Sequence, residues 1–169
     1  MTKKITPDAF QYLPLPALRF IGIDAWQTKE EWSVLWRRKY EFLPQLDAMR
    51  GKISREIPHI CALMHHDDGE IDVVNRFLVG RFFLADTPVP PGFDYHDLAP
   101  QTAAYAVFDN TTYDSLWQRY EAARDAILND GVFIPYPVGY WHAEVYLDKT
   151  PFAPGDPPFR CGVLFACNK

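Results

Sequence analysis

The stretch 140–147 holds the residues of this sequence that are best suited to bind a ligand. It reads Tyr-Trp-His-Ala-Glu-Val-Tyr-Leu, and side chains along a β-strand point alternately to opposite faces of the sheet. One face is then apolar and suited to packing under a helix, with the residues Trp141, Ala143, Val145 and Leu147. The other face carries three rings around one carboxylate, with the residues Tyr140, His142, Glu144 and Tyr146.

A carboxylate that is partly buried among rings has two stable states. It can take up a proton because burial raises its pKa, or it can stay ionised against a bound cation. The faces of aromatic rings attract the same cation, so Glu144, Tyr140 and Tyr146 indicate a site for a flat or bulky lipophilic cation. The alternative is an exposed antiparallel strand with a solvated polar face, which is common. Periodicity alone does not separate the two interpretations.

Two similar sets of elements are expected to position this strand. The first set runs strand, helix, strand, strand over 18–26, 28–51, 57–65 and 73–85, and the second repeats that order over 103–108, 113–131, 138–147 and 159–167. The proline-rich stretch 86–100 between them is interpreted as a linker. An offset of 81 residues aligns most of the two sets and places Leu63 at the position of Glu144, so the acid departs from the repeated pattern. Chance alignment of abundant aromatic residues and leucines is the alternative.

Each set is too small to bury its own apolar faces, so the two are expected to pair. The sequence therefore predicts one α+β domain over 1–169, with unit one at about 18–85 and unit two at about 101–168. The two units would be related by pseudo-two-fold symmetry in an antiparallel sheet with both helices on one face. A ligand could then sit on the open face, in a cleft between the halves.

Composition excludes several classes of protein. Apolar residues make up 48% of the chain and charged residues 23%, which is typical of a globular protein. The formal net charge is −5, and the whole acidic excess lies in residues 91–169, so a nucleic-acid-binding surface is not expected. No apolar run is long enough for a membrane helix, and the first residues do not form a signal peptide. The three cysteines show no CxxC spacing, which indicates reduced thiols and a cytoplasmic location.

Metal and nucleotide chemistry find little support in the sequence. Cys61 and His65 would stand four residues apart on a strand, too far to chelate one ion by themselves. No P-loop, GxGxxG motif or Ser-His-Asp order is present. Neither a metal nor a cofactor is therefore expected.

Three short motifs give the chain a resemblance to a known family. They are Pro91-Gly92-Phe93 with a later Pro100, then Tyr105-Ala-Val-Phe108, and finally Glu144-Val-Tyr146-Leu-Asp148. In order and spacing they resemble the GyrI-like (gyrase-inhibitor-like) effector-binding family over about residues 18–168. That family also supplies the ligand-binding domain of multidrug-responsive transcription activators.

The resemblance implies a ligand cleft between two halves of a sheet, in which Glu144 meets cationic aromatic molecules. Tyr146 and Tyr105 match motif positions, and the alternation argument adds Tyr140, His142 and Phe82 as ligand-binding candidates. A helix-turn-helix segment is not expected, since the first predicted strand begins within about twenty residues of the start. The expected partner is accordingly a small hydrophobic or cationic ligand, without direct binding of nucleic acid or membrane.

The function expected from these observations is sensing or sequestration of xenobiotic compounds. The resemblance also implies an alternative, because some stand-alone relatives resemble hydrolases of ring-strained DNA-alkylating compounds. In such an enzyme Glu144 would be the catalytic residue, acting as a general acid or base with a raised pKa. Inhibition of a topoisomerase follows from the family name alone, and an exposed apolar cleft could also serve a homodimer.

Overall fold

The computed structural model describes residues 5–29, 31–66, 76–134, 140–148 and 155–168, without the side chains of Trp32, Ser33, His66 and Tyr140. The strands are β1 (Ala9–Leu15), β2 (Leu18–Asp24), β3 (Ile60–His66), β4 (Arg76–Leu84), β5 (Asp94–Leu98), β6 (Gln101–Thr111), β7 (Tyr140–Tyr146) and β8 (Phe159–Cys167). The helices are α1 (Ala25–Thr28), α2 (Trp32–Arg37), α3 (Lys39–Asp47) and α4 (Leu116–Asn129), with short 3-10 turns η1 (Arg50–Lys52) and η2 (Tyr113–Ser115).

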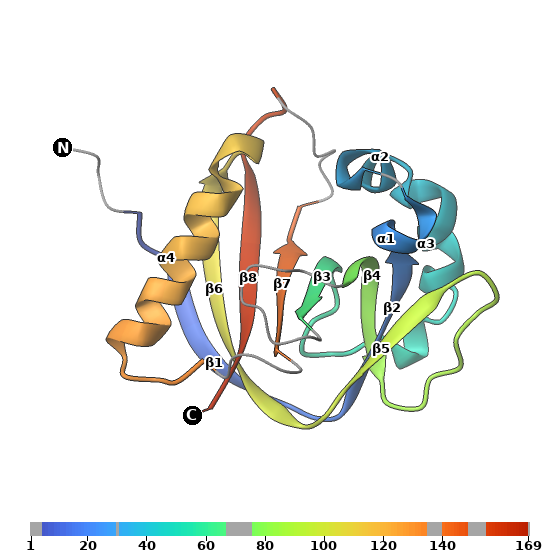
Figure 1. The fold of residues 1–169 in the computed structure, drawn as a ribbon, viewed down its shortest axis with the longest axis horizontal. Helices are drawn as coiled ribbons and strands as arrows, with labels where there is room; N and C mark the ends of the chain where they lie inside the picture. The colour runs from blue at the N-terminus through green and yellow to red at the C-terminus, as the bar shows by residue number, and fades with distance from the viewer. Residues whose placement is uncertain (1–4, 30, 67–75, 135–139, 149–154, 169) are drawn as a thin grey trace.

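The described strands form one antiparallel sheet of eight, in the order β1-β6-β8-β7-β3-β4-β2-β5. Strands β6, β8 and β7 come from the second half of the chain, and β2, β4 and β3 come from the first half in the mirrored order. The halves meet where β7 pairs with β3, in a register that sets Ala143 opposite Leu63. The α+β fold with two related strand–helix–strand–strand units is therefore confirmed (Figure 1).

Both groups of helices cover the same face of the sheet. Helices α1–α3 pack with Ala62, Val79 and Phe83, whereas α4 packs with Ala104, Val163 and Phe165. Glu144 shares this face, because Ala62 and Val163 are its direct neighbours on β3 and β8. The expectation that the apolar face of β7 lies under a helix is therefore wrong, and Glu144 points to the helix side.

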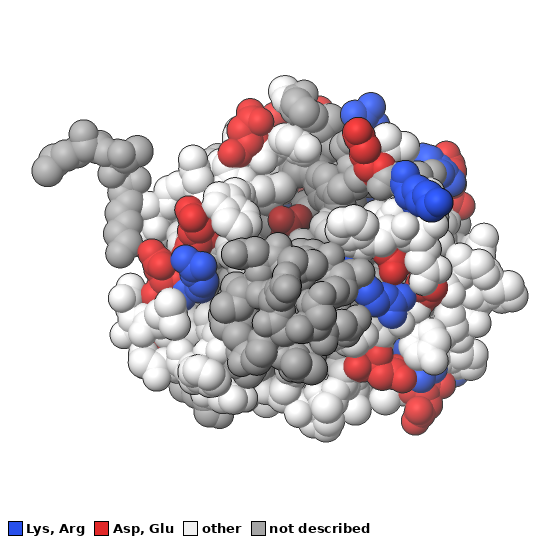
Figure 2. Space-filling view, in the orientation of Figure 1, with Lys and Arg blue, Asp and Glu red and all other residues white. Residues whose placement is uncertain are grey.

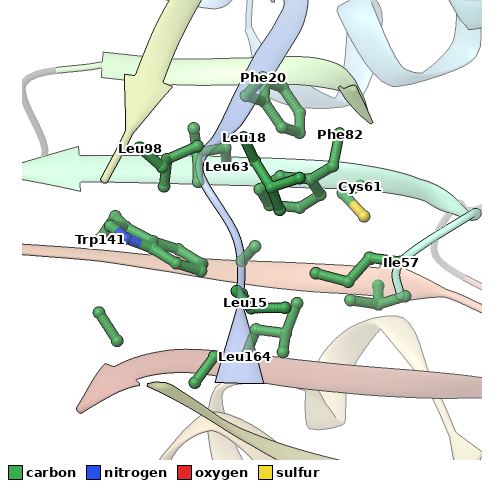
Figure 3. Packing of buried hydrophobic residues seen from close by; sticks show 14 of the residues in the cluster. Leu15, Leu18, Phe20, Ile57, Cys61, Leu63, Phe82, Leu98, Trp141 and Leu164 are labelled. Atoms are coloured by element: carbon green, nitrogen blue, oxygen red, sulfur yellow. The ribbon is translucent and has the colours of Figure 1, made fainter. Parts of the chain in front are cut away.

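The apolar face of β7 packs instead inside a core that the sheet makes by curling on itself (Figure 3). Leu15, Leu18, Phe20, Leu63, Phe82, Leu98, Trp141 and Leu164 meet there from strands all across the sheet. The curl brings the ring of His65 on β3 to 3.8 Å from that of His96 on β5. In a flat sheet these strands would be roughly 14 Å apart, because two other strands separate them. We call this side of the sheet the inner face.

Two strands were not expected from the sequence. Strand β5 lies within the stretch 86–100 that was interpreted as a linker, and β1 precedes the first predicted unit. Both are edge strands in the sheet order. Pro14 is compatible with β1 because an edge strand can leave one side of its backbone without ladder hydrogen bonds.

The offset of 81 residues fails on the strands nearest the centre. Leu63 belongs to the inner face, whereas Glu144 is on the helix side. Side chains alternate with a period of two, so an alignment of two strands that is wrong by one residue pairs residues of opposite faces. Leu63 is therefore not the structural counterpart of Glu144.

Candidate functional site

A hollow opens on the helix-covered face, between the two groups of helices (Figure 2). Helix α4 lies over β6 and β8, while α1 and α3 lie over β4, so the central strands β3 and β7 run between the two groups of helices (Figure 1). Figure 2 shows a hollow on this side of the molecule, with acidic atoms recessed at its floor. We call the space over β7, bounded by Trp36 on one side and Tyr120 on the other, the Glu144 groove.

Glu144 lies at the floor of the groove between two small apolar neighbours. Ala62 and Val163, its cross-strand neighbours, are buried, and neither offers a side-chain hydrogen bond. The Glu144 side chain is half-buried, so it keeps some contact with solvent although protein surrounds it. The Tyr146 hydroxyl donates a hydrogen bond to Glu144 Oε2. Burial raises the pKa of Glu144, and the hydrogen bond from Tyr146 opposes that rise only in part.

The first wall of the groove is aromatic and comes from the first half of the chain. The Trp36 ring on α2 lies 4.1 Å from the Tyr146 ring, centroid to centroid, and both residues are buried. Behind it, the Lys39 ammonium lies 4.5 Å from the centroid of the Trp36 ring and donates a hydrogen bond to the Trp36 carbonyl. Burial lowers the pKa of this lysine. Trp36 thus contacts both an internal cation and the phenol that holds Glu144.

The second wall is also aromatic and comes from the second half. The Tyr120 ring on α4 lies 4.8 Å from the His142 ring and 4.9 Å from the Phe165 ring. One helical turn earlier, Trp117 stacks on Tyr120 with centroids 5.0 Å apart, and 65% of Trp117 is exposed. A continuous series of rings therefore leads from solvent down to His142, which is two residues from Glu144 on the same face of β7.

The structure brings together only part of the predicted site. Glu144, Tyr146 and His142 share the groove, and Tyr140 starts the same strand, although its side chain lies outside the described residues. Phe82 is fully buried on the inner face, where it packs on Phe20 and Trp141.

Tyr105 also lies on the inner face, with its ring against Gly162. Its pKa is raised to about 12, mainly by burial. Phe82 and Tyr105 therefore do not belong to the group around Glu144, because the sheet separates them from it.

Sequence reasoning missed the two residues that form the walls. Trp36 and Tyr120 fall in the predicted helices 28–51 and 113–131, where apolar residues at helical spacing are typical of core positions. The sequence did contain one indication of the second wall. Trp117 and Tyr120 are three residues apart, a spacing that places two rings on one face of a helix.

The groove suits a ligand that combines apolar surface with positive charge. A carboxylate in apolar surroundings loses solvation that a bound cation can replace, and rings on both sides add apolar contact and cation–π attraction. Within the described ranges, no three His, Cys, Asp or Glu side chains come together as metal ligands would. The same part of the chain contains no helix long and apolar enough to cross a membrane.

Comparison with known proteins finds solved structures that share this fold. No protein-family model matches the chain, and a search of curated proteins finds no significant match. A putative transcription regulation protein of Staphylococcus aureus is 14% identical with a TM-score of 0.62, over 95% of this chain and 99% of that protein. SAV2435, solved bound to tetraphenylphosphonium, is 15% identical with a TM-score of 0.60, over 95% of this chain and 94% of that one.

A hydrolase from Listeria innocua is 10% identical with a TM-score of 0.53, over 96% of this chain and 93% of that one. At these identities the likeness shows a shared fold. That fold is consistent with a GyrI-like effector-binding domain.

Proposed function

We propose that this protein is a GyrI-like domain that binds small lipophilic cations in the Glu144 groove. The observation that carries the proposal is Glu144 itself, a half-buried carboxylate with apolar neighbours and aromatic walls on both sides. The shared fold with a protein that was solved bound to tetraphenylphosphonium supports the same class of ligand. Sensing or sequestration of foreign compounds would follow from such binding.

The binding energy has two sources in this proposal. Apolar parts of the ligand would be removed from water against Tyr120 and the exposed Trp117, since Trp36 is itself buried. Each square ångström buried contributes about 25 cal/mol. The positive charge would pair with ionised Glu144, at a site where water competes weakly. Affinity should then depend on apolar area, whereas the preference for cations should depend on Glu144.

Isothermal titration calorimetry of the full chain with tetraphenylphosphonium tests the proposal. Glu144→Gln keeps the shape of the side chain and removes its charge, so it should weaken cation binding by about tenfold or more. Triphenylphosphine oxide is neutral and of similar shape, and its affinity should hardly change in the variant. Asp114→Asn, an exposed acid on η2, is the matched control for loss of one negative charge. Equal cation affinity in the wild type and in Glu144→Gln would refute the role of the carboxylate.

A hydrolase of ring-strained compounds is the second candidate. The hydrogen-bonded pair of Glu144 and Tyr146, with a raised pKa on the acid, favours general acid catalysis. Glu144 would protonate the heteroatom of an aziridine as water attacks the ring carbon, and the shared fold with a Listeria innocua hydrolase is compatible with this. Turnover of an aziridine compound by the wild type, lost in Glu144→Gln, would favour the enzyme, whereas saturable binding without turnover favours the binding proposal.

A further inference from the structure

A hollow that shares no residue with the Glu144 groove collects arginines in a chain of net charge −5. It has a volume of about 450 Å³ and lies where the end of α3 and the segment after η1 meet β4. Its lining includes Asp47, Arg50, Ser54, Arg55, Pro58 and Arg81. Three arginines therefore line one space together with a single acidic residue.

Arg81 forms a fixed wall of this hollow. One of its terminal nitrogens lies 2.8 Å from Asp47 Oδ1, and the other donates to the Pro58 carbonyl over 2.9 Å. Its Nε is enclosed and finds no hydrogen-bond acceptor among the described residues. The side chain is thus already oriented, and binding would cost little of its conformational freedom.

The acids beside the hollow have hydrogen-bonded partners, whereas two of its arginines do not, although the charge of Arg55 also acts on the nearby Glu56. Asp47 pairs with Arg81, and Glu56 accepts a hydrogen bond from the Ser54 hydroxyl over 2.8 Å. That hydrogen bond is the main reason why the pKa of Glu56 lies below its ordinary value. In the described part of the chain, the guanidinium groups of Arg50 and Arg55 make no hydrogen bond or ion pair.

The segment that carries these two arginines is held to the sheet. Ser54 donates its backbone N–H to the Phe82 carbonyl over 2.8 Å, and Ile53 forms a β-bridge with Phe83. The backbone around Arg55 is therefore anchored to β4, which also carries Arg81.

A second hollow continues from the first one. It has a volume of about 560 Å³, shares Asp47 and Arg50 with the first hollow, and is otherwise lined by Pro44, Ala48 and Gly51. A Cβ atom built on Gly51 would meet no atom within 4 Å, so this side is open. The two hollows together form one space. It is lined by arginines at one end and by the small, uncharged residues Pro44, Ala48 and Gly51 at the other.

We propose that these joined hollows bind the phosphate ester of a small molecule. Arg50 and Arg55 would hold the phosphate against the fixed wall of Arg81, because planar guanidinium groups form paired hydrogen bonds to phosphate oxygens. The organic part of the ester would lie beside Pro44 and Gly51. Since the chain as a whole repels anions, this local arrangement must supply the attraction.

Titration of the full chain with phenyl phosphate and with inorganic phosphate, at constant ionic strength, tests the proposal. Phenyl phosphate should bind saturably in the millimolar range or tighter, and inorganic phosphate more weakly. The double variant Arg50→Gln/Arg55→Gln should lose about tenfold or more in affinity for both anions. Lys52→Gln/Arg37→Gln removes the same charge from outside the lining and should leave both affinities within about twofold. Equal losses in the two double variants, or no saturable binding by the wild type, would overturn the site.

Gly51→Leu separates an ester site from a site for free phosphate. The added side chain enters open space and should remove the advantage of phenyl phosphate while inorganic phosphate still binds. If Gly51→Leu changes the affinity for neither phenyl phosphate nor inorganic phosphate, and the wild type binds the two anions equally well, the ester is excluded as the ligand.

Discussion

The two faces of β7 place neighbouring residues of one strand in different environments, a closed apolar core on the inner face and the Glu144 groove on the helix side. On the inner face, Trp141, Ala143 and Val145 are buried among apolar side chains from both halves of the sheet. On the helix side, Glu144 is half-buried and His142 and Tyr146 each contact a wall from a different half. The difference teaches that stability and ligand chemistry can share a strand, because alternation separates them by one residue.

The largest effect on stability is expected at Trp141 on the inner face. Trp141→Ala should lower the free energy of unfolding by about 3–5 kcal/mol, because it leaves a cavity in a closed core. Trp117→Ala is the matched control on an exposed tryptophan and should change it by less than about 0.5 kcal/mol. Chemical denaturation of both variants measures the difference. Similar losses would mean that the two faces are not energetically distinct.

A smaller effect is expected from pH, which should change both cation affinity and stability through the titration of Glu144 on the helix side. Since the folded-state pKa of Glu144 is raised, tetraphenylphosphonium should bind more weakly as pH falls through that raised value and the carboxylate takes up a proton. The stability of the unliganded protein should change in the opposite sense. Stability from the protonated acid is fully present below the ordinary pKa and is lost as pH rises through the folded one.

Glu144→Gln should remove both of these pH dependences. Unfolding free energies of the wild type and of the variant, compared between about pH 4 and about pH 8, measure the stability term. Calorimetry over the same range measures the binding term. A cation affinity that varies with pH equally in both proteins would assign the titration to another group.

A moderate effect is expected from the hydrogen bond between Tyr146 and Glu144. Tyr146→Phe keeps the ring against Trp36 and removes the hydroxyl that lowers the pKa of Glu144. The pH midpoint of cation binding should therefore move upward, and affinity at neutral pH should fall by about fivefold. An unchanged midpoint would show that the hydroxyl does not stabilise the ionised acid.

The smallest effect is expected at Tyr105, on the inner face. Tyr105→Phe should leave cation affinity unchanged within about twofold, because the sheet lies between its ring and Glu144. Any loss comparable to that of Tyr146→Phe would contradict the assignment of Tyr105 to the inner face.

The sequence predicted what is local and missed what depends on curvature. The alternation of 140–147 separated the residues of β7 correctly, because a period of two needs no tertiary information. Which side the helices cover could not be predicted in that way, since it depends on how the sheet curls. Phe82 was grouped with Glu144 by the alternation argument and Tyr105 by its motif position, although both lie on the opposite face.

The residues that form the walls of the groove could not be predicted from the sequence for a different reason. Trp36 packs in a helix and looks like any other core residue until Tyr146 is known to lie beside it. Strand β5 was hidden by the prolines of the linker, and β1 by its own Pro14. The central helix–strand order was nevertheless predicted, because each of those segments has strong internal periodicity.

The position of Glu144 next to the junction of β3 and β7 has a mechanical consequence. Each wall of the groove belongs to a different half of the chain, so a molecule that fills it would contact both halves, which are already joined by the β3–β7 ladder and by the apolar core of the inner face. A bound ligand would then reduce the relative motion of the two halves at the β3–β7 junction, and the amide hydrogens of β3 and β7 would exchange with solvent more slowly.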